Sequence, residues 1–453
     1  MSNNIDLKKG LDIPIKGSAK PVVSKTVVPD TVAIVPSDFT GLTPRLLVKE
    51  GDRVLAGSPV LADKKHPEIL ITAPLSGTVK EIVRGDKRKL LEVRIGTDPI
   101  QEYMDFGCRR PESLSADEVR TALLQSGLWA AIIQRPYGVL ADPALKPKAI
   151  FISAFSTAPL APDTEFALGD EFAAVQAGVS ALAKLTDGGV HVSLKADNYA
   201  STPFHKLENV ILHTFSGPHP AGNVGVQISH IAPIRKDETV WTVSLLMTAA
   251  IGRLFLKGKY DLRRKVAVCG PMALEPSYAL TVPGVGMKEF QAWYGASAEG
   301  IRFVSGDVLS GRNVGVDGRL GFYDNQVTLL KEGTDTELFG WARPFRFNQF
   351  SSTRSYFSWL LPRKKYDMDT NLHGGPRAFV MSDDYYAKVL PMDIYPLYLV
   401  KACLAGDIDK MEQLGIYEVL PEDLALCEYI DPSKNYIQDI VRKGIDLMIQ
   451  EMA

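Results

Sequence analysis

The stretch VKEGDRVLAGSPVLADKKHPEILITAPLSGTVKEIV, residues 48–83, is built from two short halves that mirror each other. Gly51 and Gly57 punctuate the first half, and Pro74 and Gly77 punctuate the second. β-Branched and other apolar residues alternate with polar ones between these turn residues. Turns at this density, with hydrophobic residues at a period of two, predict a small flattened barrel of short strands rather than a helix.

This pattern is typical of the biotinyl/lipoyl-like barrel-sandwich hybrid, which we assign to residues 1–105. Carrier domains of that type present a modifiable lysine on the turn between the two halves, where this chain has Asp63-Lys64-Lys65. The stretch from Lys64 to Pro74 is slightly long for such a turn, and no Met-Lys-Met biotin signature is present. We interpret the turn as an exposed basic loop, with covalent modification of Lys64 as the alternative.

The composition is that of a globular protein with several domains. The chain has 453 residues, 45% hydrophobic and 23% charged, and this length predicts three or four domains. The net charge of -2 argues against a general nucleic-acid-binding surface. Residues 1–17 lack the apolar stretch of a signal peptide, and residues 240–256 are too short and too polar to span a bilayer. We therefore expect a soluble, cytoplasmic chain.

The cysteines do not form a motif. There are four, and no two are close in sequence: Cys108, Cys269, Cys403 and Cys427. This spacing argues against a disulfide framework, and a tetra-cysteine zinc or iron–sulfur site has no CxxC from which to begin. Buried, unreactive thiols are the better interpretation.

Strand and helix patterns alternate between residues 106 and 262. The run AIFISAF at 149–155 predicts a buried strand, residues 163–185 carry apolar residues at helical spacing, and residues 239–256 predict an apolar helix. Such alternation predicts a parallel sheet layered by helices, a Rossmann-like α/β domain. Neither GxGxxG nor GxxxxGK[ST] follows a strand, so the domain lacks the fingerprint of a nucleotide site.

The loop SGPHPAGNVG, residues 216–225, follows a predicted strand, where open α/β sheets keep functional loops. His213, His219 and His230 lie in or near it and could be imagined as metal ligands. Their spacing fits no helical pair, and no carboxylate or thiol stands at ligand spacing. A rigid turn at a domain or subunit contact is the favoured interpretation, and we assign no metal site.

The remaining chain divides into two parts. Residues 263–333 alternate short strands and turns with one helix candidate, which suggests a compact α+β unit of the β-grasp type. Residues 334–453 begin with an aromatic and basic tract and end in a helical domain, whose last helix carries apolar residues on one face. Those residues are Ile437, Val441, Ile445, Met448 and Met452.

The aromatic and basic tract is a candidate docking surface. Between Arg343 and Lys365 aromatic residues alternate with six Arg or Lys residues and no acid. Tyr, Trp, Phe and Arg are the residue types that anchor interfaces, and basic residues suit the anionic face of a bilayer. The alternative is a solvated basic loop whose rings pack on a neighbouring domain. The residues that we assign to docking on a partner protein or membrane are Arg354, Tyr356, Phe357, Trp359, Arg363, Lys364 and Lys365.

Several motifs carry a family resemblance when they are taken together and in order. They are GLDIPI from Gly10, the Asp63-Lys64-Lys65 turn, HPAGN at His219, SGDVLSG from Ser305, LFGWARP from Leu338, TRSYFSWL from Thr353, VLPMDIYP from Val389 and EDLALCEYIDP from Glu422. Over essentially its whole length the chain resembles the NqrA family, the A subunits of Na+-translocating NADH:quinone oxidoreductases. The wider relatives are the C subunit of Rnf-type complexes and the NADH-binding flavoprotein subunit of respiratory complex I. Their resemblance implies that residues 106–262 form an empty flavin-fold domain and that residues 263–333 form a soluble-ligand-binding β-grasp domain.

The resemblance implies a peripheral subunit on the cytoplasmic face of the bacterial inner membrane. Its partners would be the other five subunits, B to F, and chiefly the membrane-embedded B subunit, in a complex that oxidises NADH, reduces quinone and exports Na+. FAD, FMN, riboflavin and iron–sulfur centres would sit on those partners. This chain would hold no tightly bound cofactor, and quinone is its one possible ligand. No catalytic residue is assigned, and a non-redox docking scaffold is the alternative function.

Two further expectations concern ligands. A quinone site would be a shallow apolar cleft, for which the loops around Phe39 and Tyr137 are candidates, and ordinary buried aromatic residues are the alternative. The ending from Cys427 to Pro432 is similar to the C-x-x-x-C-P of a ferredoxin-type motif, but Asp431 replaces its second cysteine. Without four thiolates this region cannot supply a [4Fe–4S] cluster.

Overall fold

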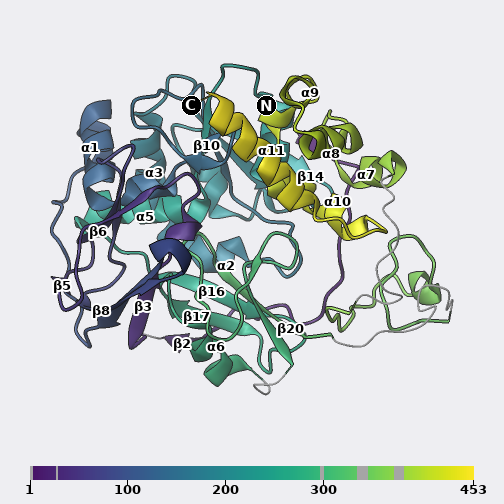
Figure 1. Cartoon of the computed structure of the whole chain (residues 1–453), viewed down its shortest axis with the longest axis horizontal. Helices are drawn as coiled ribbons and strands as arrows, with labels where there is room; N and C mark the ends of the chain where they lie inside the picture. The colour runs from purple at the N-terminus through teal and green to yellow at the C-terminus, as the bar shows by residue number, and fades with distance from the viewer. Residues whose placement is uncertain (1–3, 27–28, 296–299, 334–344, 372–381, 453) are drawn as a thin grey trace.

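The computed structural model describes residues 4–26, 29–295, 300–333, 345–371 and 382–452 (Figure 1). Its first part is the barrel predicted from residues 48–83, made of two small sheets in which every strand pair is antiparallel. One sheet has the order β3 (Thr31–Ile34), β9 (Leu90–Thr97), β8 (Gly77–Arg84) and β5 (Arg53–Val54), and the other the order β4 (Pro44–Leu46), β6 (Pro59–Asp63) and β7 (Leu70–Thr72).

Alternation of side chains closes this barrel. Val60, Ile71, Val79 and Val93 are buried in the same core. In β8 and β9 the residues on either side of Val79 and Val93 are less buried, as period-two strands require. The prediction of a small barrel of short strands is confirmed.

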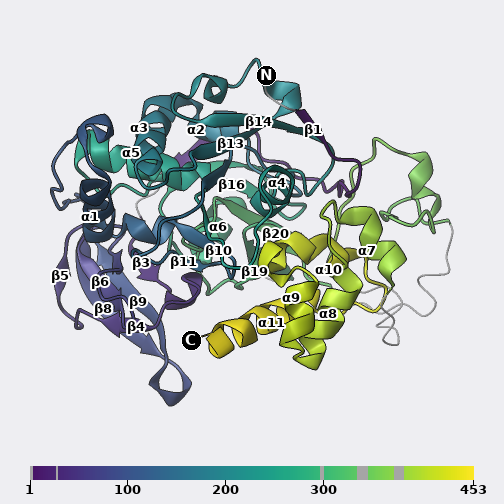
Figure 2. The ribbon, with the colours of Figure 1, turned by 90° about the horizontal axis from the view of Figure 1, so that it is seen from above.

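The second part is a mixed sheet of the order β1, β14, β13, β12, β15, β10 and β11, whose first five strands run parallel. The helices α3 and α5 cover one face and α4 the other, with α1 and α2 beside them (Figure 2). The bounds are β1 (Asn4–Asp6), β10 (Ile133–Arg135), β11 (Val139–Leu140), β12 (Ile150–Ser153), β13 (Val190–Lys195), β14 (Ile211–Ser216), β15 (Val240–Thr242), α1 (Ala116–Ser126), α2 (Thr164–Leu168), α3 (Phe172–Ala183), α4 (Val224–Ile231) and α5 (Leu245–Lys257).

Burial on both faces explains the unbroken apolar run of β12. Ile150 and Ile152 pack with the α3 and α5 side, and Phe151 packs with Ile228 of α4. The single helix predicted over residues 239–256 is wrong in its first part, which forms the strand β15. Ser244, two residues after that strand, caps α5 and its side chain accepts from the Met247 amide at 3.2 Å.

A third sheet has the order β19, β18, β20, β16, β17 and β2 and packs against α6. Its core joins Val266 and Val268 to Phe290, Phe303 and Leu329. The bounds are β2 (Val23–Thr26), β16 (Arg264–Cys269), β17 (Ser277–Thr281), β18 (Ile301–Ser305), β19 (Arg312–Asn313), β20 (Gln326–Lys331) and α6 (Met287–Tyr294).

The end of the chain forms a cluster of helices beside the parallel sheet (Figure 2). These are α7 (Asp383–Val389), α8 (Pro396–Ala405), α9 (Ile408–Gln413), α10 (Ala425–Ile430) and α11 (Ile437–Met452). Four of the residues predicted to share one face of the last helix are fully buried in this cluster: Ile437, Val441, Ile445 and Met448. In the described ranges, no helix combines the length and the apolar character needed to cross a membrane.

Residues 4–26, which the predicted boundaries place with the barrel, supply strands to the two other sheets. β1 pairs in parallel with β14, and β2 pairs in parallel with β17. Between them Leu7, Ile13 and Ile15 enter the core of the C-terminal helices. This segment, the N-terminal strap, therefore ties three parts of the molecule together.

Candidate functional site

At the carboxyl ends of the parallel strands, loops of the parallel sheet meet a loop of the third sheet and the segment before α10. A cavity of about 260 Å³ lies there, lined by His219 and Asn223 after β14, by Asp307 and Ser310 of the third sheet, and by Glu422 before α10. An imidazole, an amide and two carboxylates face it together with apolar side chains. This lining suits a small polar molecule better than the apolar tail of a quinone.

His219 is held in place by hydrogen bonds rather than left free. Its peptide N–H donates to Asp12 Oδ1 of the N-terminal strap at 2.9 Å, and its ring Nδ1 lies 3.1 Å from Thr157 Oγ1. Asn223 Nδ2 donates to the Glu422 carbonyl at 3.2 Å. Burial lowers the pKa of His219, so the ring is neutral at pH 7. The loop thus lies where the sheet, the strap and the C-terminal helices meet.

The other two histidines considered as metal ligands have different neighbours. His213 Nε2 lies 2.9 Å from Nδ1 of His191 on the adjacent strand β13, and His230 Nδ1 lies 2.8 Å from the Val226 carbonyl. Burial lowers the pKa of His191 to about 4. Within the part of the chain that the structure describes, no group of three or more His, Cys, Asp or Glu residues could hold a metal ion.

A buried ion pair beside this cavity was not predicted. Arg135, at the end of β10, is 1% exposed, and its two terminal nitrogens lie 2.8 Å from Asp423 Oδ2 and 2.8 Å from Glu422 Oε1. The pair joins the parallel sheet to the C-terminal helices. The one sequence signal was an arginine in the otherwise uncharged run AAIIQRPYG, which does not identify a partner almost 290 positions away.

The crevice at which an α/β sheet of this kind would bind a nucleotide lies between the carboxyl ends of β12 and β15. A cavity of about 220 Å³ remains there, lined by Ser153 and Ser244 on one side and by Asp307 and Asn325 of the third sheet on the other. Loops of the third sheet therefore narrow the crevice. The start of α5 is capped by its own Ser244.

Phe39, proposed as quinone-proximal, is part of a core. It is 3% exposed, with its ring centroid 4.8 Å from that of Phe322 and 6.1 Å from that of Tyr323. The void beside it measures about 20 Å³. That volume holds roughly one water molecule, not a quinone head group.

Tyr137, the second quinone-proximal residue, faces the C-terminal helices. Its ring lies 6.2 Å from that of Tyr417 in an edge-on arrangement, and its carbonyl accepts from Arg442 Nη1 at 2.9 Å. The Phe39 and Tyr137 loops do meet, because the Leu140 amide donates to the Thr40 carbonyl at 3.1 Å. The backbones come together while the two rings face different neighbours.

The predicted docking residues lie in a loop at one end of the molecule (Figure 1), which we call the basic-aromatic loop, residues 345–366. Several large apolar side chains are exposed there, among them Phe345 at 76% and Trp359 at 46%. Arg363 and Lys365 are exposed too. Arg343 and Trp341, at the start of the predicted tract, lie outside the described residues.

The basic-aromatic loop holds its own shape through contacts among its members. The Arg354 guanidinium stacks 5.6 Å from the Trp359 ring, Phe345 and Phe357 pack edge-on at 5.3 Å, and Lys364 Nζ donates to the Phe347 carbonyl at 2.8 Å. Tyr356 lies 5.7 Å from the Arg346 guanidinium.

At its base, the Tyr366 amide donates to the Pro14 carbonyl at 2.8 Å, and the Lys16 amide donates to the Tyr366 carbonyl at 3.0 Å. The loop is therefore anchored to the body through the N-terminal strap.

The Lys64 turn is anchored by its aspartate. Asp63 is buried and its Oδ1 accepts from the Thr43 amide at 3.0 Å and the Lys65 amide at 3.3 Å. Lys64 itself is exposed. In the same turn, His66 Nδ1 lies 3.9 Å from Oδ1 of Asp142, which follows β11. The turn is therefore close to the mixed sheet.

The ferredoxin-like ending is a buried structural turn. Asp431, where the motif would have its second cysteine, is fully buried, and its Oδ2 accepts from the Asn435 amide at 2.8 Å and from Asn435 Nδ2 at 2.7 Å. Burial raises the pKa of the Cys427 thiol, so the thiol stays protonated. The carboxylate closes the turn that leads into α11.

Two models of protein-family domains match this chain. Residues 5–98 match the family model described as the NqrA N-terminal barrel-sandwich hybrid domain, and residues 114–260 match the NqrA second alpha/beta domain. The barrel-sandwich hybrid and the α/β domain inferred from sequence are thereby confirmed.

Relatives match over the full length. The A subunit of the Na(+)-translocating NADH-quinone reductase from Serratia proteamaculans is 38% identical, over 99% of this chain and 100% of its own. The protein of the same name from Neisseria meningitidis is 36% identical over 99% and 100%. The chain belongs to this family, the A subunits of Na(+)-translocating NADH-quinone reductases.

One solved structure, an NAD+-reducing [NiFe]-hydrogenase, aligns with a TM-score of 0.32 and 14% identity over 49% of this chain and 50% of its own. That likeness is too low to bear on fold or function.

Proposed function

We propose that this chain is a peripheral subunit of a Na+-pumping NADH:quinone reductase, located at the cytoplasmic face of the inner membrane, where it supports the reduction of quinone to quinol. The observation that carries the proposal is the match over 99% of the chain to relatives named for the A subunit of such an enzyme. The other subunits, B to F, would be its partners.

Docking would occur through the basic-aromatic loop, and the principal partner would be the membrane-embedded B subunit. Exposed rings beside unburied Arg and Lys side chains are what an interface hot spot needs, because rings fill pockets and guanidinium groups bind carboxylates. Trp359 with Arg354 stacked on it supplies both features. The loop extends from the body (Figure 2) and is therefore accessible to a partner.

The experiment is co-purification. A tagged chain expressed with its partner subunits should bring down all five, and membranes lacking the chain should lose Na+-dependent quinol formation. Membranes that keep full quinone reductase and Na+ transport activity without this chain would contradict the proposal. The tagged chain purifying alone from membranes that contain the complex would contradict it as well.

A quinone contact on this chain would involve the meeting of the Phe39 and Tyr137 loops. Saturation-transfer NMR with a short-chain quinone should then show contact, with binding weakened by Tyr137→Ala. The void of about 20 Å³ beside Phe39 favours the second candidate function, a non-redox scaffold that positions redox subunits. A complete absence of saturation transfer, with assembly intact, would select the scaffold.

We also propose that FAD, FMN, riboflavin and iron–sulfur centres reside on partner subunits. The isolated chain should then be colourless, and its intact mass should equal that of the unmodified polypeptide. A visible absorption band that persists after desalting and releases stoichiometric flavin or iron would contradict this assignment. An added mass of lipoyl or biotin size on Lys64 would instead support the carrier alternative.

A further inference from the structure

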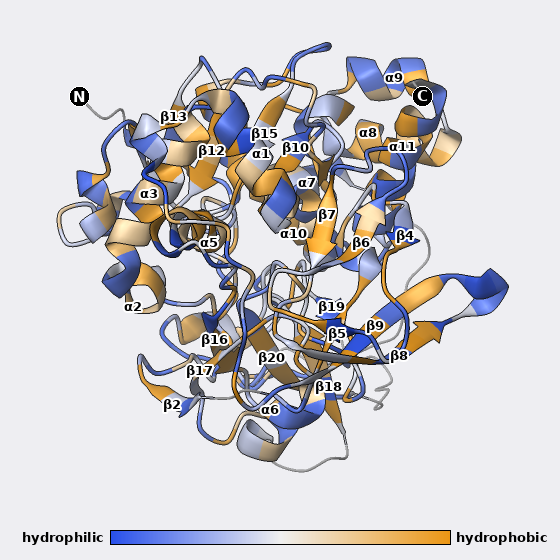
Figure 3. Cartoon of the chain, turned by 90° about the vertical axis from the view of Figure 1, so that its left-hand side faces the viewer, coloured by the Kyte–Doolittle hydropathy of each residue, from blue (hydrophilic) through white to orange (hydrophobic). Residues whose placement is uncertain are grey.

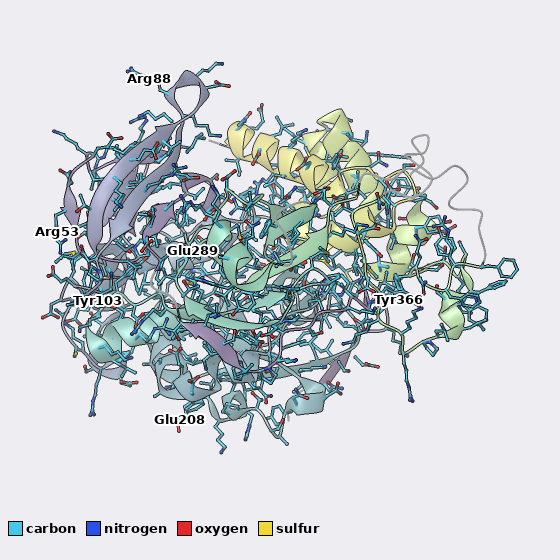
Figure 4. All side chains as sticks on the ribbon, turned by 90° about the horizontal axis from the view of Figure 1, so that it is seen from below. Arg53, Arg88, Tyr103, Glu208, Glu289 and Tyr366 are labelled. Carbon is cyan, nitrogen blue, oxygen red and sulfur yellow. The ribbon has the colours of Figure 1, made fainter. Side chains whose placement is uncertain are left out.

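The hairpin formed by β8 and β9 projects from the barrel and ends in basic residues (Figures 2 and 4). Each strand has eight residues, and the tip between them reads RGDKRK, residues 84–89. Figure 4 places Arg88 at the outermost point of the hairpin, on the side that carries α11. Figure 3 shows a hydrophilic tip on a more hydrophobic stem.

The positive charges of this tip are not neutralised within the chain. Arg84, Lys87, Arg88 and Lys89 are all exposed, and none forms an ion pair with another described residue. Asp86 is the one acid in the tip, which leaves a local charge of +3 from four bases and one acid, in a chain whose net charge is -2.

The acids of the stem are already engaged. Glu81 lies 2.7 Å and Glu92 2.8 Å from nitrogens of Arg94. They therefore compensate Arg94 in the stem rather than the charges at the tip.

Lys87 and Arg88 at the tip have a left-handed backbone conformation, which is unfavourable for residues other than glycine. Lys87 and Arg88 have φ angles of +51° and +61°, in the left-handed region that costs an ordinary residue about 1–2 kcal/mol. Asn-Gly is the pair that tight hairpin turns prefer. The two basic side chains make no ion pair or ring contact with described residues that would offset this cost. The Arg84 guanidinium donates to the Arg88 carbonyl at 3.1 Å, which supports the turn but does not involve the Lys87 and Arg88 side chains. Two basic side chains that make no ion pair with a described residue, on a backbone that disfavours them, point to an external role.

We propose that the β8–β9 tip binds the anionic phospholipid headgroups of the bilayer, as a second contact apart from the basic-aromatic loop. This inference rests on the proposed function, which brings the chain to a membrane. Flexible point charges suit headgroups, which accept each charge independently. Protein interfaces are instead depleted in Lys and centred on aromatic anchors, and residues 84–91 contain no aromatic residue.

The test uses the purified full chain and large unilamellar vesicles of phosphatidylcholine, with or without roughly 30% phosphatidylglycerol to supply a physiological charge density. Co-sedimentation should show binding to the anionic vesicles, little binding to the neutral ones, and weaker binding as salt rises. Each charge near such a surface contributes about fivefold in affinity, so removing three charges weakens binding on the order of 100-fold. The charge reversal in Lys87→Glu/Arg88→Glu/Lys89→Glu should weaken binding to the anionic vesicles by at least that factor.

Two controls separate headgroup binding from other causes. Lys8→Glu/Lys9→Glu/Lys206→Glu makes the same change in net charge at exposed lysines away from the hairpin; Glu208, beside the last of them, lies at the opposite side from Arg88 in Figure 4. This variant should keep wild-type binding. Lys87→Asn/Arg88→Gly removes two charges and relieves the backbone, so it should bind about 25-fold more weakly while melting at or above the wild-type temperature.

Each outcome decides the proposal. Wild-type binding by the Lys87→Asn/Arg88→Gly variant, or equal binding to both vesicle types, would overturn it. The proposal would also be overturned if the wild-type chain did not bind vesicles while its tip variants dissociated from the assembled complex. That result would mean that the tip contacts an acidic protein surface. Co-purification of the wild-type chain with its partners tests the proposed function separately and does not depend on vesicle binding.

Discussion

Two regions form hydrogen bonds with the N-terminal strap, and the surroundings of their side chains differ. At the junction of the sheet and the C-terminal helices, Arg135, His219 and Asp423 are buried and bonded to partners inside the chain. In the basic-aromatic loop, Trp359 and Phe345 are exposed. Side chains at the junction therefore bind partners inside the chain, whereas the exposed rings of the loop remain available to another protein.

The strap connects the two regions physically. Asp12 accepts the His219 amide at the junction, and a few residues later Pro14 and Lys16 exchange backbone hydrogen bonds with Tyr366 at the base of the loop. Because the junction residues are buried and bonded inside the chain, substitutions there should reduce the stability of the isolated chain. Substitutions in the loop should reduce assembly and leave stability almost unchanged.

The largest effect is expected at Arg135. Arg135→Ala leaves Asp423 buried without its counter-charge, which costs about 3–5 kcal/mol of unfolding free energy. Urea denaturation followed by circular dichroism would measure this change. Arg53→Ala is the matched control, because Arg53 pairs with Asp98 and Glu102 at the surface and its removal should barely move the midpoint. Equal midpoints for the two variants would contradict the internal role of Arg135.

The next effect is expected in the strap, where two glycines form a matched pair. Gly17 and Gly51 have nearly the same backbone, with φ of +92° and +90°. A Cβ on Gly17 would meet the Gly270 carbonyl oxygen at 2.2 Å, whereas a Cβ on Gly51 meets nothing within 4 Å. Gly51→Ala should therefore cost about 1 kcal/mol from φ alone. Gly17→Ala should cost about 2 kcal/mol more because the strap must move away from the third sheet.

Thermal melting of the two alanine variants would test that difference. A Gly17→Ala protein as stable as Gly51→Ala would mean that the strap is loosely held, and that it does not couple the junction to the basic-aromatic loop.

The barrel and much of the sheet could be predicted because their information is local. Turn residues and alternating apolar positions in residues 48–83 fix short strands without reference to distant residues. The prediction of a single helix over residues 239–256 is wrong in its first part, since an apolar run of a few residues does not distinguish a buried strand from a helix. The pairing of β1 and β2 with other sheets depends on contacts more than 200 positions away.

The site was less predictable than the fold for the same reason. Nothing near Arg135 in the sequence identifies Asp423 as its partner, and the cavity beside His219 requires four segments to converge. Phe39 and Tyr137 lie in loops that meet, but burial is a property of the assembled core. Burial in that core decides whether an aromatic ring can contact a ligand or packs against a neighbouring side chain.

A smaller effect on stability, but a clear one on assembly, is expected in the basic-aromatic loop. Arg363→Glu/Lys364→Glu/Lys365→Glu should release the chain from membranes that contain its partners. Because Lys364 also binds the Phe347 carbonyl, the double variant Arg363→Glu/Lys365→Glu is the cleaner test of charge. It should weaken binding by at least ~2 kcal/mol, from ~1 kcal/mol for each positive charge lost, with a melting temperature close to that of the wild type. Full co-purification of the triple variant at physiological salt would show that docking lies elsewhere.

The smallest effect is expected at the junction, where acid should reduce stability through His219. Burial lowers the pKa of His219, with Asp307 and Asp12 partly opposing, so the unfolded chain takes up a proton that the folded chain resists. Below the unfolded value of about 6.5 the unfolded state therefore binds more protons, and stability falls as pH falls toward the folded pKa. His219→Gln should flatten this part of the stability profile between about pH 7 and 5. The Arg and Lys side chains of the basic-aromatic loop stay charged across that window, so loop variants should keep the wild-type slope. Urea midpoints measured at several pH values would decide, and parallel profiles for His219→Gln and wild type would mean that the imidazole is free to protonate where it lies.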